Sequence, residues 1–177
     1  MPGTDEELLL AIARGDERAL AELYDRLGRV AYGLALRVLR DPALAQDAVQ
    51  DAFLATWRTA ASFDPGRGTA STWVLTLVHR RAVDLVRREE RRRGDPLDTA
   101  PVASGDSVDE TVEVREQRRN VQAALAQLPP DQRQALELAY YGGLSQSELA
   151  ERLGVPLGTV KSRMFAGLSK LRDLLES

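Results

Sequence analysis

Apolar residues recur every three or four positions through most of this 177-residue chain, which is the spacing of one face of an α-helix. The segment after Asp16 is the clearest example, with apolar residues at Leu20, Leu23, Leu27, Val30, Ala31 and Leu34. Alternating apolar and polar positions, and the aromatic or β-branched runs typical of strands, are scarce. The pattern therefore predicts an all-α fold.

Capping residues divide the first half of the chain into four predicted helices. Thr4 and Glu7 have the spacing of a capping box, and Asp16 and Asp41 are suited to be N-caps. A turn-forming segment, residues 63–68, reads as a loop between the third and fourth helices. The expected helices span about residues 5–14, 17–39, 42–60 and 69–92.

The helical pattern stops after Arg93. Residues 94–116 contain prolines, glycines and many acidic side chains, with Arg115 as the basic exception. A segment of low hydrophobicity and like charge cannot bury a core, so we expect a flexible linker. Its last turns, from about Asp109, can already be helical. The predicted organisation is a domain at residues 1–93, the linker at 94–116 and a second domain at 117–177.

The second domain carries a helix-turn-helix pattern between Ser145 and Arg163. A second capping box, Ser145 with Glu148, opens a short helix that ends at Gly154, a residue suited to a left-handed helix end. The apolar positions that would hold the two helices together are Leu149, Ala150, Leu153, Val155, Val160 and Met164. Helices are expected at about residues 118–128, 130–141, 146–153 and 157–175.

The entry of the last helix would face outward, and in such motifs this end enters the major groove of DNA. The candidate DNA-binding residues there are Leu157, Gly158, Thr159, Lys161, Ser162, Arg163 and Phe165. The alternative is a plain helical hairpin with a solvated charged face. The coincidence of cap, glycine turn and spaced apolar anchors favours DNA binding.

A second candidate surface is the basic run on the fourth helix. Its arginines are Arg80, Arg81, Arg87, Arg88, Arg91, Arg92 and Arg93, opposed by Asp84, Glu89 and Glu90. Runs of this kind are often solvated helix faces. The glycine-rich loop before it and the helix-turn-helix after it favour a second nucleic-acid contact. Trp57 and Trp73 are expected to pack in the core.

The composition limits the chemistry that this chain can perform. Asp and Glu number 27 against 24 Lys and Arg, so the average charge argues against DNA binding, but the basic residues are clustered. The chain has no cysteine and one histidine, His79, so we expect no disulfide, metal site, cofactor or catalytic site. No apolar run is long enough to span a membrane and the N-terminus is acidic, so a cytoplasmic protein without membrane insertion is expected.

Asp47, Gln50 and Asp51 form a third candidate surface. Their spacing places them on one face of the third helix. Paired carboxylates can perform acid–base catalysis or bind a metal, but no further carboxylate or histidine lies near them in the sequence. A polar face that docks another protein is the favoured interpretation.

These motifs together resemble the extracytoplasmic-function (ECF) sigma factors of the sigma-70 family over nearly the whole chain. Residues 47–57 resemble the helix that binds core RNA polymerase, residues 71–88 resemble the −10 promoter segment, and residues 128–171 resemble the −35 domain. His79-Arg80 stands where the family often has Arg-Asn.

The resemblance implies a role for each surface. Asp47, Gln50 and Asp51 would bind core polymerase, and the outer face of the last helix would read the −35 element of promoter DNA. The implied −10 residues are Phe63, Asp64, Arg67, Trp73, His79, Arg80, Arg81, Arg87 and Arg88. The protein would help to open DNA and leave after initiation, and an anti-sigma factor would hold it inactive.

Two other classes of protein stay open at this point. A transcriptional repressor or activator would use the helix-turn-helix and bind its site without polymerase. A nucleic-acid enzyme would use the basic helix as a substrate cleft and would need clustered catalytic or metal-binding side chains.

Overall fold

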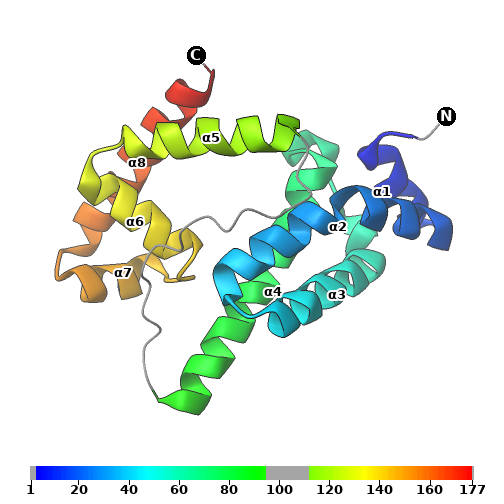
Figure 1. Ribbon diagram of the computed structural model, residues 1–177, viewed down its shortest axis with the longest axis horizontal. Coiled ribbons are helices and arrows are strands. Elements are labelled where there is room, and N and C mark those ends of the chain that lie inside the picture. The colour runs from blue at the N-terminus through cyan, green and yellow to red at the C-terminus, as the bar shows by residue number, and fades with distance from the viewer. Residues whose placement is uncertain (1–2, 95–111, 177) are drawn as a thin grey trace. The chain divides into compact units, whose positions relative to one another are not determined.

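The computed structural model describes residues 3–94 and 112–176 (Figure 1). The chain divides into two compact units, residues 1–97 and 98–177. Every regular element within the described ranges is a helix, which confirms the predicted all-α fold.

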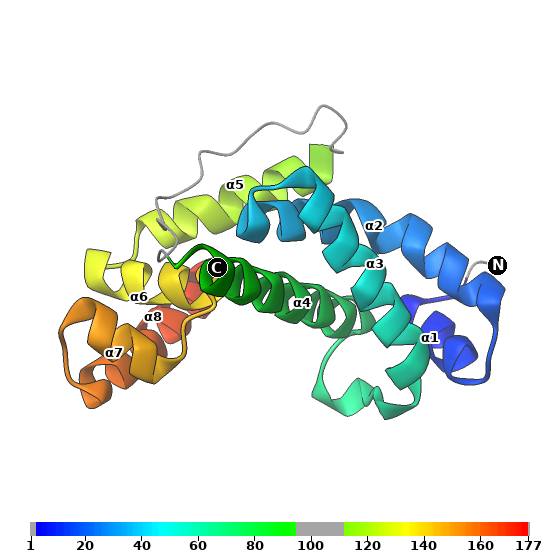
Figure 2. The same ribbon diagram turned by 90° about the horizontal axis from the view of Figure 1, so that it is seen from below.

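The first unit contains four α-helices and two short 3₁₀ helices. Helices α2, α3 and α4 pack against one another, and α1 lies against all three of them (Figures 1 and 2). Their bounds are α1 Asp5–Ala13, α2 Glu17–Leu39, α3 Pro42–Thr59, η1 Ala60–Ser62, η2 Pro65–Arg67 and α4 Ala70–Arg93.

The predicted caps of the first unit are present. Thr4 Oγ1 accepts the Glu7 backbone N–H at 3.2 Å, and Glu7 Oε2 accepts the Thr4 backbone N–H at 2.9 Å, which completes the capping box. The carboxylates of Asp16 and Asp41 accept backbone N–H groups in the first turns of α2 and α3. These bonds satisfy donors that a helix leaves open at its start, and so they fix where each helix begins.

The core of the first unit lies between the buried faces of its helices. Leu9, Ile12 and Leu23 are almost completely buried, as are Val74 and Val78 on α4. Buried residues on α4 recur every fourth position, so the opposite side of that helix is open to solvent. The two tryptophans are only half-buried, and the expectation of core packing therefore holds in part.

The second unit contains α5 Val112–Ala126, α6 Pro130–Tyr140, α7 Gln146–Leu153 and α8 Leu157–Glu176. The predicted capping box is present, with Ser145 Oγ accepting the Glu148 N–H at 3.2 Å. Gly154 ends α7 with a φ of 64°, the left-handed conformation that glycine adopts without a steric penalty.

One expected element differs from the structure. The segment at residues 63–68 is not a continuous loop, because Pro65–Arg67 form η2. At the end of the expected linker, residues 112–116 belong to α5, in agreement with the expectation that its last turns can be helical. The remainder of that segment, residues 95–111, lies outside the described residues.

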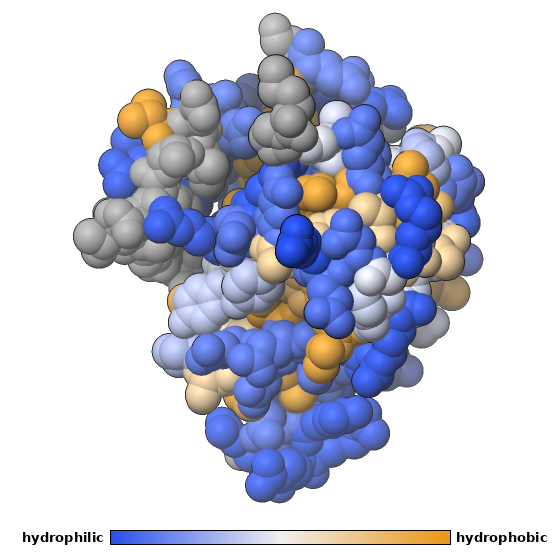
Figure 3. Space-filling view, turned by 90° about the vertical axis from the view of Figure 1, so that its right-hand side faces the viewer, coloured by the Kyte–Doolittle hydropathy of each residue, from blue (hydrophilic) through white to orange (hydrophobic). Residues whose placement is uncertain are grey.

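On the face shown in Figure 3, hydrophilic side chains predominate and the apolar ones occupy small areas between them. No helix in the described ranges is long and apolar enough to cross a bilayer.

Candidate functional site

The helix-turn-helix is held by a small apolar core. Leu149 on α7 and Val160 on α8 are fully buried and pack with Leu138 of α6. The predicted anchors Val155 and Met164 pack against this cluster. The Pro156 carbonyl then accepts the N–H groups of Thr159 and Val160, at 3.0 and 3.2 Å, in the first turn of α8. Buried contacts on one side of α8 therefore hold this helix within its unit.

The outer side of α8 presents most of the predicted DNA-binding residues to solvent. Leu157, Gly158, Lys161, Ser162 and Phe165 are exposed, and Thr159 is half-buried. Phe165 is 77% exposed, which is unusual for a large apolar side chain in a folded domain. Leu168, one turn further on, is also exposed and was not among the predicted residues. Exposed apolar side chains beside Lys161 suit a contact surface rather than a solvated face.

Arg163 differs from the other predicted residues of α8. Its Nε lies 3.2 Å from Asp131 Oδ2 on α6, and its side chain is 26% exposed. Close by, α8 approaches α6 at Gly167, where an added Cβ would lie 3.0 Å from Leu136 Cδ1. In this structure Arg163 therefore joins α8 to α6 instead of extending from the outer face.

The segment before α4 is shaped by an aromatic pair. Phe63 is only 9% exposed, and its ring meets the Trp73 ring edge-on at a centroid distance of 5.9 Å. Asp64 Oδ1 accepts the Gly66 N–H at 2.9 Å, which forms the η2 turn. Arg67 stays exposed at the end of that turn. The structure thus brings Phe63 and Trp73 together as support and leaves Asp64 and Arg67 at the surface.

The basic residues of α4 are divided by their exposure. Arg80 and Arg88 are exposed, whereas His79, Arg81 and Arg87 are half-buried along the flanks of the helix, as the burial pattern shows. Near the end of α4, Glu89 forms ion pairs with Arg92 at 3.1 Å and with Arg93 at 3.9 Å. The basic run is therefore partly neutralised at its C-terminal end, and the cations nearer to residues 63–68 are better suited to bind phosphate.

The third predicted surface lies on α3. Asp47, Gln50 and Asp51 are all exposed on one face of this helix. Leu54, which follows at the same helical spacing, is 53% exposed and adds an apolar side chain to that face. The signal for Leu54 was present in the spacing, because it lies three residues after Asp51.

An open groove lies between α2 and α3, beside the face with Asp47, Gln50 and Asp51. Its volume is about 530 Å³. The residues that line it are Tyr24, Asp25, Gly28, Arg29, Tyr32, Gln46 and Val49. In the described part of the chain, no three His, Cys, Asp or Glu side chains gather as a metal site would require.

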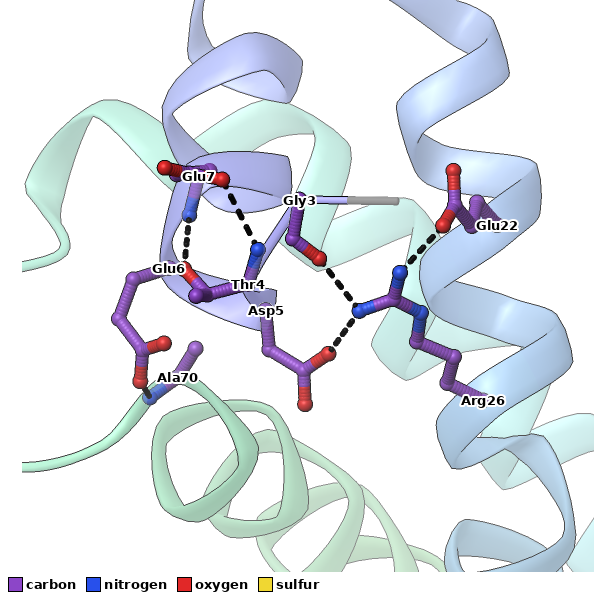
Figure 4. Close-up of polar contacts among 8 residues, drawn as sticks. All are labelled: Gly3, Thr4, Asp5, Glu6, Glu7, Glu22, Arg26 and Ala70. Atoms are coloured by element: carbon purple, nitrogen blue, oxygen red, sulfur yellow. Dashed lines mark hydrogen bonds and ion pairs between the residues drawn. The ribbon is translucent and has the colours of Figure 1, made fainter. Parts of the chain in front are cut away.

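A polar network joins α1 to α2 and to the start of α4 (Figure 4). Arg26 Nη1 donates to the Gly3 carbonyl at 2.7 Å and to Asp5 Oδ1 at 3.0 Å, and Nη2 pairs with Glu22. Glu6 Oε1 accepts the Ala70 backbone N–H at 3.0 Å. The bond from Ala70 is the largest of the effects that lower the pKa of Glu6 below its ordinary value.

Comparison with known proteins identifies both units. The family description "Sigma-70 region 2" matches residues 23–92, and "Sigma-70, region 4" matches residues 118–171. The chain belongs to the sigma-70 family. This family consists of transcription initiation factors rather than catalytic enzymes.

Individual relatives indicate to which group of the sigma-70 family this sigma factor belongs. ECF RNA polymerase sigma factor SigK of Mycobacterium sp. (strain KMS) is 42% identical, over 97% of this chain and 91% of its own. SigK of Mycobacterium bovis (strain BCG / Pasteur 1173P2) is 41% identical, over 97% and 93%. The solved structure of Rhodobacter sphaeroides SigE in complex with the anti-sigma ChrR is 31% identical, covers 98% of both chains and has a TM-score of 0.48. The SigK relatives show that this chain is a sigma factor of the ECF group.

Besides Leu54, sequence reasoning missed three contributors to the surfaces of this sigma factor. Nothing in the local sequence of Asp131 or Glu6 indicates a distant partner, and only the fold shows that they meet Arg163 and Ala70. Leu168 lies beyond the entry of α8, so a search limited to the start of that helix did not include it. Each of these residues depends on contacts between helices or on exposure, which local spacing does not report.

Proposed function

We propose that this sigma factor binds core RNA polymerase and directs initiation at promoters that it reads through a −35 and a −10 element. It works in the cytoplasm and carries no catalytic site or cofactor of its own. The rival interpretation as an autonomous regulator accounts only for the helix-turn-helix, whereas the family match also covers α2 to α4.

The observation that carries this proposal is the outer face of α8. Lys161, Ser162 and Phe165 are exposed at the entry of a helix whose other side is locked by Val160. The Lys161 ammonium can donate to phosphates or base edges, and an exposed aromatic ring can contact a thymine methyl group. The Ser162 hydroxyl donates to the Thr159 carbonyl at 3.0 Å and can still accept a hydrogen bond from a base edge. This combination suits the reading of a −35 element in the major groove.

Arg163 receives a different role in this proposal. Its ion pair with Asp131 ties α8 to α6 at 3.2 Å. A side chain held in this way fixes the angle at which α8 meets DNA, and does not read a base itself. Of the residues implied by resemblance, we therefore assign Lys161, Ser162 and Phe165 to DNA and Arg163 to orientation.

For the −10 element, we assign DNA contact to exposed residues just before α4 and in the middle of that helix. Arg67 lies before the helix, and Arg80 lies on its exposed side. Opened DNA offers unstacked bases and a flexible backbone, which arginine side chains can hold. Phe63 and Trp73 support the segment from behind, because the first is buried against the second.

The face with Asp47, Gln50, Asp51 and Leu54 is the proposed docking surface for core polymerase. Protein interfaces combine a few apolar anchors with charged groups around them, and this face has that composition. The acidic charge would select a basic surface on the polymerase and speed the encounter.

We also propose that an anti-sigma factor holds this protein inactive by covering the same face. The support is the groove of about 530 Å³ beside it, in which the partly exposed rings of Tyr24 and Tyr32 are available to a partner. Aromatic side chains are frequent energetic centres of protein interfaces. A partner seated there would exclude polymerase by direct competition.

Transcription in vitro tests the main proposal. Core polymerase with this protein is expected to start RNA synthesis at a defined set of promoters in a genomic DNA library, and core polymerase alone is not. Sequence-specific footprints by this protein without polymerase, and no new transcripts with it, would favour the autonomous regulator instead.

Recovery of the protein from its native unstressed cells tests the regulatory proposal. We expect a stoichiometric partner that is displaced when excess core polymerase is added. Recovery with core polymerase only, and no such partner, would contradict it.

A further inference from the structure

Helix α1 lies outside both segments that match the family, yet it contacts the start of α4. The matched segments begin at residue 23, whereas α1 spans Asp5–Ala13. From α1, the Glu6 carboxylate reaches across 64 positions of sequence to the Ala70 backbone N–H, at 3.0 Å. Figure 4 shows this bond at the first turn of α4. The bond is thus a long-range connection into the segment that follows residues 63–68.

Glu6 acts as part of the N-terminal cap of α4. The first N–H groups of a helix have no partner within it, and side-chain oxygens usually satisfy them. Thr69 Oγ1 accepts the Thr72 N–H at 3.2 Å, and Glu6 accepts the Ala70 N–H. The local cap and the distant carboxylate therefore bind different donors of the same turn. A carboxylate at this end also interacts favourably with the helix dipole.

Helix α1, which carries Glu6, is held in place by its contacts with the rest of the first unit. Leu9 is fully buried and Ile12 is 2% exposed, so one face of α1 is held in the core. Arg26 binds the Gly3 carbonyl and Asp5, which ties the start of α1 to α2. Helix α1 also contacts η1, on the other side of residues 63–68. Helix α1 thus meets the elements on both sides of that segment.

We propose that Glu6 is a positioning residue for promoter opening, because it fixes the first turn of α4 against α1 and so sets where residues 63–68 meet single-stranded DNA. This inference rests on the proposed role of that segment at the −10 element. Helix α1 then belongs to the DNA-opening apparatus, although it touches no DNA.

The variants that test this role separate the contact from the charge. Glu6→Ala removes the acceptor for the Ala70 N–H. Glu6→Gln keeps a neutral oxygen in the same place, and an amide oxygen still accepts this bond. Glu7→Ala is the control for a general loosening of the start of α1, because Glu7 is the next residue and completes the capping box with Thr4 but makes no bond to Ala70. A protein shortened within residues 63–68 is the reference for lost opening.

Two readouts in the full-length protein are needed. Hydrogen exchange at the Ala70 amide reports the bond itself, and it should speed up in Glu6→Ala and stay protected in Glu6→Gln and Glu7→Ala. Permanganate reactivity of promoter DNA with core polymerase reports opening. In Glu6→Ala we expect the opened fraction to fall roughly three- to tenfold, as for a lost helix cap, while closed complexes form normally. Glu6→Gln should restore most of it, and Glu7→Ala should open DNA normally.

The outcomes distinguish this inference from the function on which it rests. Normal opening by Glu6→Ala, with the shortened protein inactive, would overturn the role of Glu6 and leave the role of residues 63–68 intact. A parallel loss of closed complexes would show that Glu6 only stabilises the fold, and would also overturn the inference. Normal opening by the shortened protein would refute the proposed −10 role, and the positioning role of Glu6 with it.

Discussion

The two surfaces that we assign to DNA use their phenylalanines in opposite ways. In the first unit, Phe63 is 9% exposed and packs edge-on against Trp73. In the second unit, Phe165 is 77% exposed at the entry of α8. An aromatic residue beside a candidate DNA surface can therefore be either part of the support or part of the contact, and burial decides between them.

The basic residues likewise divide into those that support the fold and those that are exposed for contact. Arg163 is held by Asp131, and Arg26 is held by Asp5 and Glu22, whereas Lys161 is exposed. An arginine that already binds a carboxylate loses that partner if it turns to phosphate. Residue type therefore indicates a candidate site. Whether a side chain contacts DNA or supports its neighbours depends on the partners that the fold places beside it.

The largest expected difference is in stability. Phe63→Ala should lower the free energy of unfolding by about 3 kcal/mol, because it removes a buried ring that supports Trp73. Phe165→Ala should change it by less than about 0.5 kcal/mol, because the ring is exposed. Chemical denaturation of the full-length protein, followed by helix content, measures both. Equal losses of stability in the two variants would contradict the assignment of Phe63 to the support and of Phe165 to the contact surface.

The second difference concerns DNA affinity. Phe165→Ala and Lys161→Ala should each weaken binding of the polymerase complex to its −35 element by about 1–3 kcal/mol if a base is read. Lys161→Ala weakens all promoters alike if it touches only phosphate. Footprinting at the upstream element on matched and mutated promoters separates these cases. Unchanged footprints after both substitutions would contradict the proposal that α8 contacts the −35 element.

An effect of intermediate size is expected on polymerase binding when the docking face on α3 is changed. Asp51→Lys should weaken binding to core polymerase roughly tenfold, because it reverses a charge in the interface, and folding should be unaffected. Asp173→Lys, an exposed acid near the end of α8, is the matched charge reversal outside the face. Titration of labelled protein with core enzyme checks this, and equal affinity of both variants would count against the face.

The smallest effect is expected for the pair that orients α8. Arg163→Ala and Asp131→Ala should each cost at most about 1 kcal/mol of stability, since the pair is partly exposed. If the pair acts by orientation, the two substitutions should weaken −35 binding to a similar extent, and the double substitution should add little. A loss confined to Arg163→Ala would show that Arg163 contacts DNA directly.

Much of this fold follows from local signals in the sequence. Capping boxes at Thr4 and Ser145, the glycine turn at Gly154 and the spacing of apolar residues each fix a helix end or a helix face within a few positions. Such signals act between near neighbours, so a linear reading finds them. The acidic composition of the segment before α5 allowed its start to be placed only approximately, from about Asp109, and the described helix begins at Val112.

The candidate sites were only partly predictable. Spacing placed Asp47, Gln50 and Asp51 on one exposed face, as the structure has them. It did not separate Phe63 from Phe165, because whether a ring is covered depends on the helices that pack over it. Contacts between helices, such as those of Arg163 with Asp131 and of Glu6 with Ala70, likewise cannot be predicted from local spacing.

The central claim is that residues 63–68 with α4 open the promoter while α8 anchors the protein upstream. The most direct measurement is permanganate reactivity at the start site, made together with footprinting of the −35 element, on promoter complexes of core polymerase with each variant. A protein shortened within residues 63–68 should keep the upstream footprint and lose the reactivity. Normal reactivity in that variant, or loss of the upstream footprint along with it, would contradict the division of roles between the two units.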